Sequence, residues 1–256
     1  MKPTQIKSSL TTAIKAKRPV FIWGAPGVGK SQVVAQVAAE SELELTDVRA
    51  VLLDPVDLRG LPHINGEGKA HWATPAFLPQ KGKGILFLDE LNAAPLLVQA
   101  ACYQLILDRK LGEYELPEGW SVFAAGNRET DKAVTFRMPS ALANRFIHLN
   151  FDVDLEDWVA WALSANIRIE VIAFIRFRPG LLHQFEPTKN EKTFPSPRTW
   201  EYVSDILKSN PPEDIEFELI AGTVGEAAAA EFMGFMKIYR DLPDPDAILI
   251  DPKGSP

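Results

Sequence analysis

Short, uninterrupted apolar runs divide the first part of the chain. The clearest are residues 20–23, 84–88 and 120–126. Runs of this length without polar alternation are typical of parallel strands buried on both faces. The segments between them repeat their apolar residues every three or four positions, as helices do. Residues 1–151 are therefore predicted to form an α/β fold in which a parallel sheet is flanked by helices.

Further helices and strands fill the intervals between these runs. The amphipathic pattern of residues 4–17 predicts a helix before the first run, and Arg18-Pro19 ends it. The other elements predicted in this part are helices over 31–40, 92–108 and 139–145, strands over 43–53 and 146–150, and a small hairpin over 111–116.

An insertion is predicted after the strand over 43–53. Asp54 and Pro55 have the residue types of a helix N-cap and first turn, and Gly60 ends this short helix. Asn65-Gly66 is typical of hairpin turns, so residues from about 61 to 74 are predicted to form a β-hairpin with an exposed tip. A plain surface hairpin and a hairpin that contacts a partner both fit this pattern.

The pattern changes beyond residue 151. From Leu155 onward apolar residues keep a helical spacing, which predicts a separate helical subdomain over 152–240. Prolines and acidic residues then dominate residues 241–256, which are predicted to form an extended or disordered tail.

The first chemical signal lies between the run 20–23 and the helix over 31–40. Residues 24–31 fit G-x-x-x-x-G-K-[ST], the P-loop signature, in its required strand–loop–helix context. Glycines let successive N–H groups face one concavity that holds phosphate oxygens, while Lys30 reaches the β- and γ-phosphates and Ser31 reaches Mg²⁺. The predicted ligands are ATP or ADP with Mg²⁺, and the predicted nucleotide-binding residues are Gly24, Ala25, Pro26, Gly27, Val28, Gly29, Lys30, Ser31 and Gln32.

Polar residues follow the next two apolar runs. Asp89 and Glu90 end the run 84–88, where Asp89 is predicted to hold Mg²⁺ and Glu90 to polarise the attacking water. Asn127 and Arg128 follow the run 120–126, at the sheet edge where ligands of open α/β folds bind. Asn127 can bond a γ-phosphate and orient water, although an ordinary turn asparagine is the alternative.

Arg198 stands at the predicted start of a helix in the second subdomain. A cation at this position works against the helix dipole, which indicates that it meets an anion. A surface salt bridge is the alternative.

Charge and cysteine content limit the classes of function. The net charge is −7, so there is no basic footprint for duplex DNA, which disfavours nucleic acid as a partner. The single cysteine, Cys102, cannot form an internal disulfide, which favours a reducing, cytoplasmic location, and it is predicted to be a buried small hydrophobe. No leader or membrane span is expected. The histidines lack the spacing of metal ligands and are predicted to be ordinary surface or turn residues: His63, His71, His148 and His183.

In this order the motifs resemble an AAA+ ATPase of the MoxR-like, dynein-related branch, over residues from about 18 to 241. The resemblance rests on the P-loop, the Asp89-Glu90 strand end, Asn127, residues 139–146 and residues 196–198. It implies that the hairpin is the insertion directed at a central pore, and that the helical subdomain is a lid.

The resemblance also implies residue roles and partners. Asn127 matches the sensor-1 position, Arg145 the arginine finger that acts in trans on a neighbouring subunit, and Arg198 the sensor-2 position, with Arg128 and Arg137 as rivals for the finger. The implied assembly is a homo-oligomeric ring, generally a hexamer, that remodels a protein client, often one with a von Willebrand A domain. The predicted catalytic residues are then Glu90, Lys30, Asn127, Arg145 and Arg198.

Two other functions fit the same fold. One is a nucleic-acid motor or loader, against which the acidic charge counts. The other is a nucleotide-controlled scaffold that does not hydrolyse ATP, against which Glu90 counts because such a scaffold has no need of a water-activating base.

Overall fold

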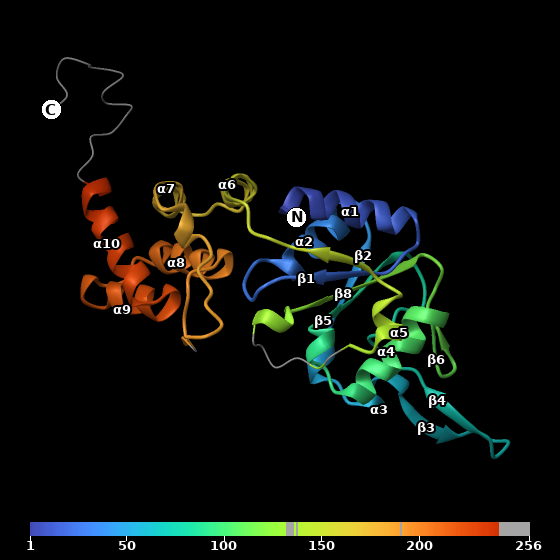
Figure 1. The fold of residues 1–256 in the computed structure, drawn as a ribbon. Helices are drawn as coiled ribbons and strands as arrows, with labels where there is room; N and C mark the ends of the chain where they lie inside the picture. Colours follow the sequence, from blue (N-terminus) through green and yellow to red (C-terminus); the bar gives the residue numbers. More distant parts are fainter. Residues whose placement is uncertain (132–135, 137, 190, 241–256) are drawn as a thin grey trace. The chain divides into compact units, whose positions relative to one another are not determined.

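A computed structural model describes residues 1–131, 136, 138–189 and 191–240 (Figure 1). The predicted tail over 241–256 and the finger candidate Arg137 lie outside the described residues. The chain divides into two compact units: Met1–Asp154 with Glu186–Lys189, and Leu155–Phe185 with Asn190–Pro256. Within the described part of the chain, no helix is both long and apolar enough to cross a membrane.

The first unit is built on a five-stranded parallel sheet, as the apolar runs predict. Its strand order is β2-β5-β8-β1-β9, so β8 lies between β1 and β5. The carboxyl ends of these three central strands therefore meet at one edge of the sheet. The strands are β1 (Val20–Trp23), β2 (Glu44–Arg49), β5 (Gly84–Asp89), β8 (Trp120–Gly126) and β9 (Ile147–Asn150).

Helices cover both faces of this sheet. Figure 1 shows α1 (Pro3–Lys15) and α2 (Lys30–Glu40) on one side, with α4 (Leu96–Asp108) and α5 (Ser140–Ala143) on the other. The α2 helix buries four apolar residues at helical spacing, and α4 buries Cys102 in the core beneath β5 and β8, as predicted for that cysteine. The four buried residues of α2 are Val33, Val34, Val37 and Ala38.

Two predicted boundaries are wrong. The strand predicted over 43–53 ends at Arg49 and continues as the 3₁₀ turn η1 (Ala50–Leu52). The helix predicted over 92–108 starts only at Leu96, because a proline disfavours helical backbone in the residue before it, and Ala94 is extended ahead of Pro95. Residues Leu91–Ala93 instead form a separate 3₁₀ turn, η2, directly after Glu90.

The predicted insertion is present. Asp54 caps α3 (Pro55–Arg59), Gly60 ends it, and β3 (Leu61–Ile64) pairs with β4 (Ala70–Ala73) in an antiparallel hairpin. The turn is longer than the dipeptide suggests: Asn65 N–H donates to the Lys69 carbonyl at 2.9 Å, and the glycine with a left-handed φ of 74° is Gly68. A smaller hairpin follows α4, with strands β6 (Lys110–Leu111) and β7 (Tyr114–Glu115).

The second unit is helical and has its own aromatic core. Phe174, Trp200 and Phe232 contact one another there, with ring centroids 5.2 to 5.7 Å apart. The helix α9 is missing from the sequence prediction, because its apolar residues surround the helix and single out no stripe. The helices of this unit are α6 (Leu155–Ser164), α7 (Ile169–Phe177), α8 (Pro197–Lys208), α9 (Glu213–Val224) and α10 (Glu226–Arg240), with a 3₁₀ turn at Pro179–Leu181.

Candidate nucleotide site

The loop between β1 and α2 has the backbone that the P-loop motif predicts. Gly29, the N-cap of α2, has a φ of 100°, and Gly27 has a φ of 78°, both in the left-handed region that favours glycine. The first N–H groups of α2 cannot bond within the helix, so they point out of its N-terminus toward the loop. This arrangement suits an anion such as a phosphate.

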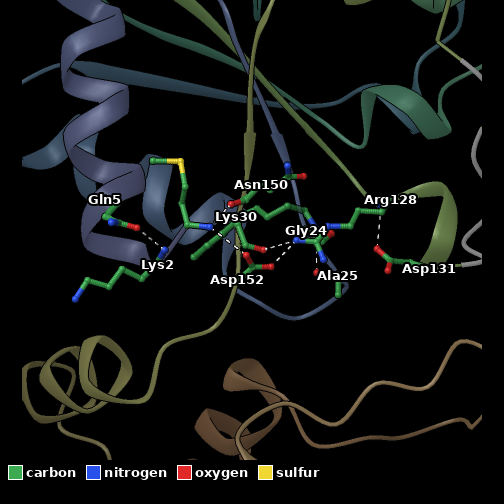
Figure 2. Close-up of polar contacts among 11 residues, drawn as sticks. Lys2, Gln5, Gly24, Ala25, Lys30, Arg128, Asp131, Asn150 and Asp152 are labelled. Atoms are coloured by element: carbon green, nitrogen blue, oxygen red, sulfur yellow. Dashed lines mark hydrogen bonds and ion pairs between the residues drawn. The ribbon is translucent and has the colours of Figure 1, made fainter.

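Lys30 is folded back over this loop. Its Nζ donates to the carbonyl oxygens of Gly24 and Ala25 at 2.7 and 3.1 Å (Figure 2). It also donates to Asn127 Oδ1 at 2.9 Å. The last bond exists because β8, which ends just before Asn127, is hydrogen-bonded to β1. The structure thus brings two of the predicted site residues, Lys30 and Asn127, into direct contact.

A second contact joins α2 to β5. Ser31 Oγ donates to Asp89 Oδ2 at 2.8 Å, and Asp89 is only 5% exposed. A hydroxyl and a buried carboxylate are hard oxygen ligands of the kind Mg²⁺ takes, with water completing the shell, so the donor set fits this ion. Among the described residues no group of three or more His, Cys, Asp or Glu side chains could hold a metal by itself.

Glu90 follows the strand in a constrained conformation. Its φ is 55°, in the left-handed region that is uncommon for residues with a Cβ, and its backbone N–H donates to Asp89 Oδ1 at 2.9 Å. The side chain is half-buried. Asp89 therefore accepts one hydrogen bond on each carboxylate oxygen. The bond to the Glu90 N–H holds the Glu90 backbone, and with it the direction of the Cα–Cβ bond of Glu90, beside Asp89.

Two residues near Asp89 and Asn127 are absent from the sequence prediction of the site. Asp47 lies on β2, where burial, and then the charge of Asp89, raise the pKa of its carboxyl, while Arg49 lowers it. Asn92, in η2, is buried and bonds to the Asn127 backbone. Neither belongs to a motif, and only the strand order and the turn after Glu90 bring them to the site.

The Arg128 side chain is hydrogen-bonded within the first unit. Its Nη2 donates to the Phe151 carbonyl at 3.1 Å. It also donates to Asp152 Oδ1 at 2.6 Å (Figure 2). This hydrogen bond holds the pKa of Asp152 below its ordinary value, against the opposing effect of burial. The Met1 ammonium also donates to Asp152, at 3.1 Å.

Arg145 lies at the opposite edge of the sheet from the P-loop. It follows α5 and precedes β9, whose first residue, Ile147, pairs with Val20 at the start of β1. The side chain is exposed, and among the described residues no ion pair involves it. Arg145 therefore cannot reach the P-loop of its own sheet across the length of β1.

His148 supports the turn that carries Arg145. Its Nδ1 accepts a hydrogen bond from Trp23 Nε1 at 2.8 Å, which leaves Nε2 to donate to the Ala143 carbonyl at 2.7 Å. The prediction that His148 is an ordinary surface or turn residue is incomplete, since this exposed side chain ties β1 to the end of α5.

Arg198 belongs to the second unit. It is exposed in the first turn of α8, whose N-cap, Ser196, accepts from the Thr199 N–H at 3.2 Å. The helix start is thus confirmed, while the anion predicted for Arg198 stays a prediction.

Comparison with known proteins agrees with this geometry. A family model described as AAA domain (dynein-related subfamily) matches residues 19–146. Midasin of Giardia intestinalis is 27% identical over 188 residues, which cover 68% of this chain and 4% of midasin. The chain thus corresponds to a small part of that relative.

Two solved structures share the fold. A mutant of Thermotoga maritima RuvB superposes with a TM-score of 0.55 at 19% identity, covering 99% of this chain and 79% of that one. Brucella abortus NtrX in complex with ADP gives 0.53 at 14% identity, covering 93% and 67%. At such identities the likeness extends to the fold alone.

Proposed function

Because the chain belongs to the dynein-related subfamily of AAA domains, we propose that it is a Mg²⁺-dependent ATPase that works as a ring of identical subunits. The observation that carries the proposal is the junction of three strand ends. Lys30 bonds Asn127 at 2.9 Å and Ser31 bonds Asp89 at 2.8 Å, so the P-loop and the polar residues after β5 and β8 form one cluster.

In this proposal the P-loop holds the phosphates of ATP. The N–H groups at the start of α2 and the Lys30 ammonium face the β- and γ-phosphates. Lys30 exchanges contacts with loop carbonyls for contacts with phosphate oxygens, and Asn127 remains beside it to bond the γ-phosphate. The NtrX structure with ADP supports nucleotide binding by this fold.

Ser31 and Asp89 would hold Mg²⁺. The ion supplies positive charge that offsets the charge building on the phosphate oxygens as the γ-phosphate is transferred. Ser31 offers its hydroxyl oxygen, and the buried Asp89 carboxylate holds that hydroxyl in place.

Glu90 is the proposed general base. Its backbone bond to Asp89 Oδ1 orients the side chain relative to the proposed metal ligand, and a carboxylate there can accept a proton from the attacking water. Glu90→Gln should keep nucleotide binding and lose turnover, which a filter-binding assay beside a phosphate-release assay would measure. Turnover at the parent rate in Glu90→Gln would exclude this role.

Arg145 is the proposed finger acting in trans. Its place at the far edge of the sheet from its own P-loop supports action on a neighbour, whereas Arg128 is held by Asp152. Fingers of other NTPases are worth about 10³-fold or more in rate, so an isolated subunit should be nearly idle. Arg198, in the helical lid, is the proposed second cation for the phosphates.

The test is turnover per chain over a wide range of protein concentration. Turnover should rise steeply as subunits associate, and Arg145→Ala should abolish the rise without loss of nucleotide binding. Arg176→Ala removes another exposed arginine, on α7, and serves as the matched control. Flat turnover that does not depend on Arg145 would contradict composite sites.

The proposed client is a protein. More specifically, we propose a client that contains a von Willebrand A domain. Supporting it, the β3–β4 hairpin exposes Leu61, Ile64 and Trp72, which are 68%, 76% and 39% exposed. A crosslinker placed at the exposed Glu67 should capture a client from a native extract only when ATP is present. Binding of single- or double-stranded DNA that weakens with salt would instead favour a nucleic-acid motor.

A further inference from the structure

Asn92 lies outside every motif but is built into the site. It is 2% exposed in η2, two residues after Glu90. Its side-chain Nδ2 donates to the Asn127 backbone carbonyl at 2.8 Å, and its backbone carbonyl accepts a bond from the Phe136 N–H at 2.7 Å. One residue thus bonds both Asn127 and Phe136, nine positions apart on the chain that leaves β8.

The contact with β8 is unusually close. A Cβ built on Gly126 would lie 2.0 Å from Asn92 Oδ1, a distance that real Cβ atoms do not show. Glycine at the end of β8 is therefore required for the Asn92 amide to occupy this position. Gly126 at the end of β8 and the Asn92 side chain therefore fit each other directly beside Asn127.

The amide carries a cost that packing does not explain. Within the described part of the chain Asn92 Oδ1 is buried without a hydrogen-bond partner, and burying an unsatisfied acceptor is unfavourable. An apolar side chain of the same shape would avoid that cost. What the amide provides is the single bond from Nδ2 to the Asn127 backbone.

We propose that Asn92 is a positioning residue that holds the Asn127 peptide so that the Asn127 side chain remains beside Lys30 and on the γ-phosphate of ATP. The proposal rests on the proposed function. It links the turn that carries Glu90 to Asn127 through one hydrogen bond, and Asn127 to Lys30 through a second, of 2.9 Å. Asn92 would thereby determine how strongly the site prefers ATP to ADP.

The test compares ATP and ADP affinity, measured by calorimetry with Mg²⁺, in the parent chain and in Asn92→Leu. ADP affinity should stay within about twofold, because the P-loop is untouched. The preference for ATP should fall about tenfold or more, the size expected when a bond to a charged group is lost. In turnover assays kcat should fall more than KM changes.

Gln99→Leu is the matched control. Gln99 is fully buried, its Nε2 donates to the Ala94 carbonyl at 3.0 Å, and its Oε1 also has no partner among the described residues. It lies in α4 and makes no bond to Asn127. Removing this amide should leave the preference for ATP unchanged, although it disturbs the core to a similar degree.

A double-mutant cycle separates positioning from general loss of structure. In an Asn127→Ala background, Asn92→Leu should cause no further loss of ATP preference, because its effect passes through Asn127. If Asn92→Leu does not fold, Asn92→Ala carries the same expectations.

Several results would overturn the inference. They are an unchanged ATP preference in Asn92→Leu, an equal loss of ADP and ATP affinity, the same behaviour in Gln99→Leu, and additive effects in the cycle. Any of these in a parent chain that hydrolyses ATP removes the role of Asn92 alone. A parent chain that neither binds nor hydrolyses ATP overturns the proposed function, and this inference with it.

Discussion

Asp152 illustrates how a single contact makes stability depend on pH. Its pKa lies below the ordinary value because Arg128 donates a hydrogen bond to it. A group with a lowered folded-state pKa stabilises the fold above its unfolded pKa, and that contribution disappears as the pH falls through the folded pKa. Asp152→Asn should therefore reduce the free energy of unfolding at neutral pH and have no effect in strong acid.

The expected loss is about 0.2–1 kcal/mol, the range for exposed ion pairs, since the Asp152 side chain is 59% exposed. Urea denaturation at neutral pH and at about pH 2, below the ordinary carboxyl pKa, would measure it. Glu118→Gln removes another exposed carboxylate, far along the chain from Arg128, and should show no such pH dependence. An equal loss at both pH values would mean that shape rather than charge matters at Asp152.

Cys102 offers a second prediction for a single residue. Burial in the core raises the pKa of its thiol to about 12, so almost no thiolate forms near neutral pH. A thiol reagent at about pH 8 should therefore not react with the folded protein and should react fully once denaturant is added. Because the chain has one cysteine, the signal has a single source. Rapid reaction of the native protein would show that α4 opens readily.

Among the elements, the β3–β4 hairpin depends on Gly60. This residue has a φ of 84°, and a Cβ placed on it would lie 1.8 Å from the Ala73 carbonyl oxygen. Gly60→Ala must therefore separate the base of the hairpin and should cost about 1–3 kcal/mol of stability. Gly66→Ala is the control, since its Cβ would meet nothing within 4 Å and its φ is not in the left-handed region.

Thermal denaturation of the two variants would measure the difference. We expect a lower midpoint for Gly60→Ala and a midpoint close to that of the parent for Gly66→Ala. Equal midpoints in all three proteins would mean that α3 and the hairpin do not pack as described.

Elements were predictable from sequence where local rules decide them. Apolar runs predict β1 and β8 to the residue, and the Asp54 and Gly60 caps of α3 are confirmed. The order of the strands was not predictable, because it depends on contacts between residues far apart in the chain. The dipeptide Asn65-Gly66 predicts the hairpin turn at these two residues. In the structure the Asn65 side chain accepts bonds from the N–H groups of Glu67 and Lys69, and the left-handed residue is Gly68.

The site likewise contains residues that local sequence predicts and residues that only long-range contacts bring there. Spacing predicts Lys30, Ser31, Asp89 and Asn127 as residues of one site. In the structure Lys30 bonds Asn127 and Ser31 bonds Asp89. Asn92 could not be predicted, because its role depends on the 3₁₀ turn after Glu90 and on the neighbouring strand. The roles proposed for Glu90, Arg145 and Arg198 remain predictions.

For the whole molecule, we expect a mutation in the core of one unit to lower the stability of that unit alone. Phe232 is fully buried between Phe174 and Trp200, so Phe232→Ala should destabilise the helical unit by about 3–5 kcal/mol. Hydrogen exchange should accelerate in α7, α8 and α10 and stay unchanged in β1, β5 and β8. Phe177→Ala, at a position that is 68% exposed, is the control, and exchange that accelerates equally in both units would contradict this independence.

The strand order also bears on solubility. β2 is an outer strand of the sheet, and such a strand offers unpaired backbone groups on which another chain can add a strand. Its exposed positions are Glu44, Asp47 and Arg49, all charged, and Val48 is its one buried residue. Bringing a second copy of this edge alongside would desolvate those charges, so these three residues also protect the sheet from aggregation.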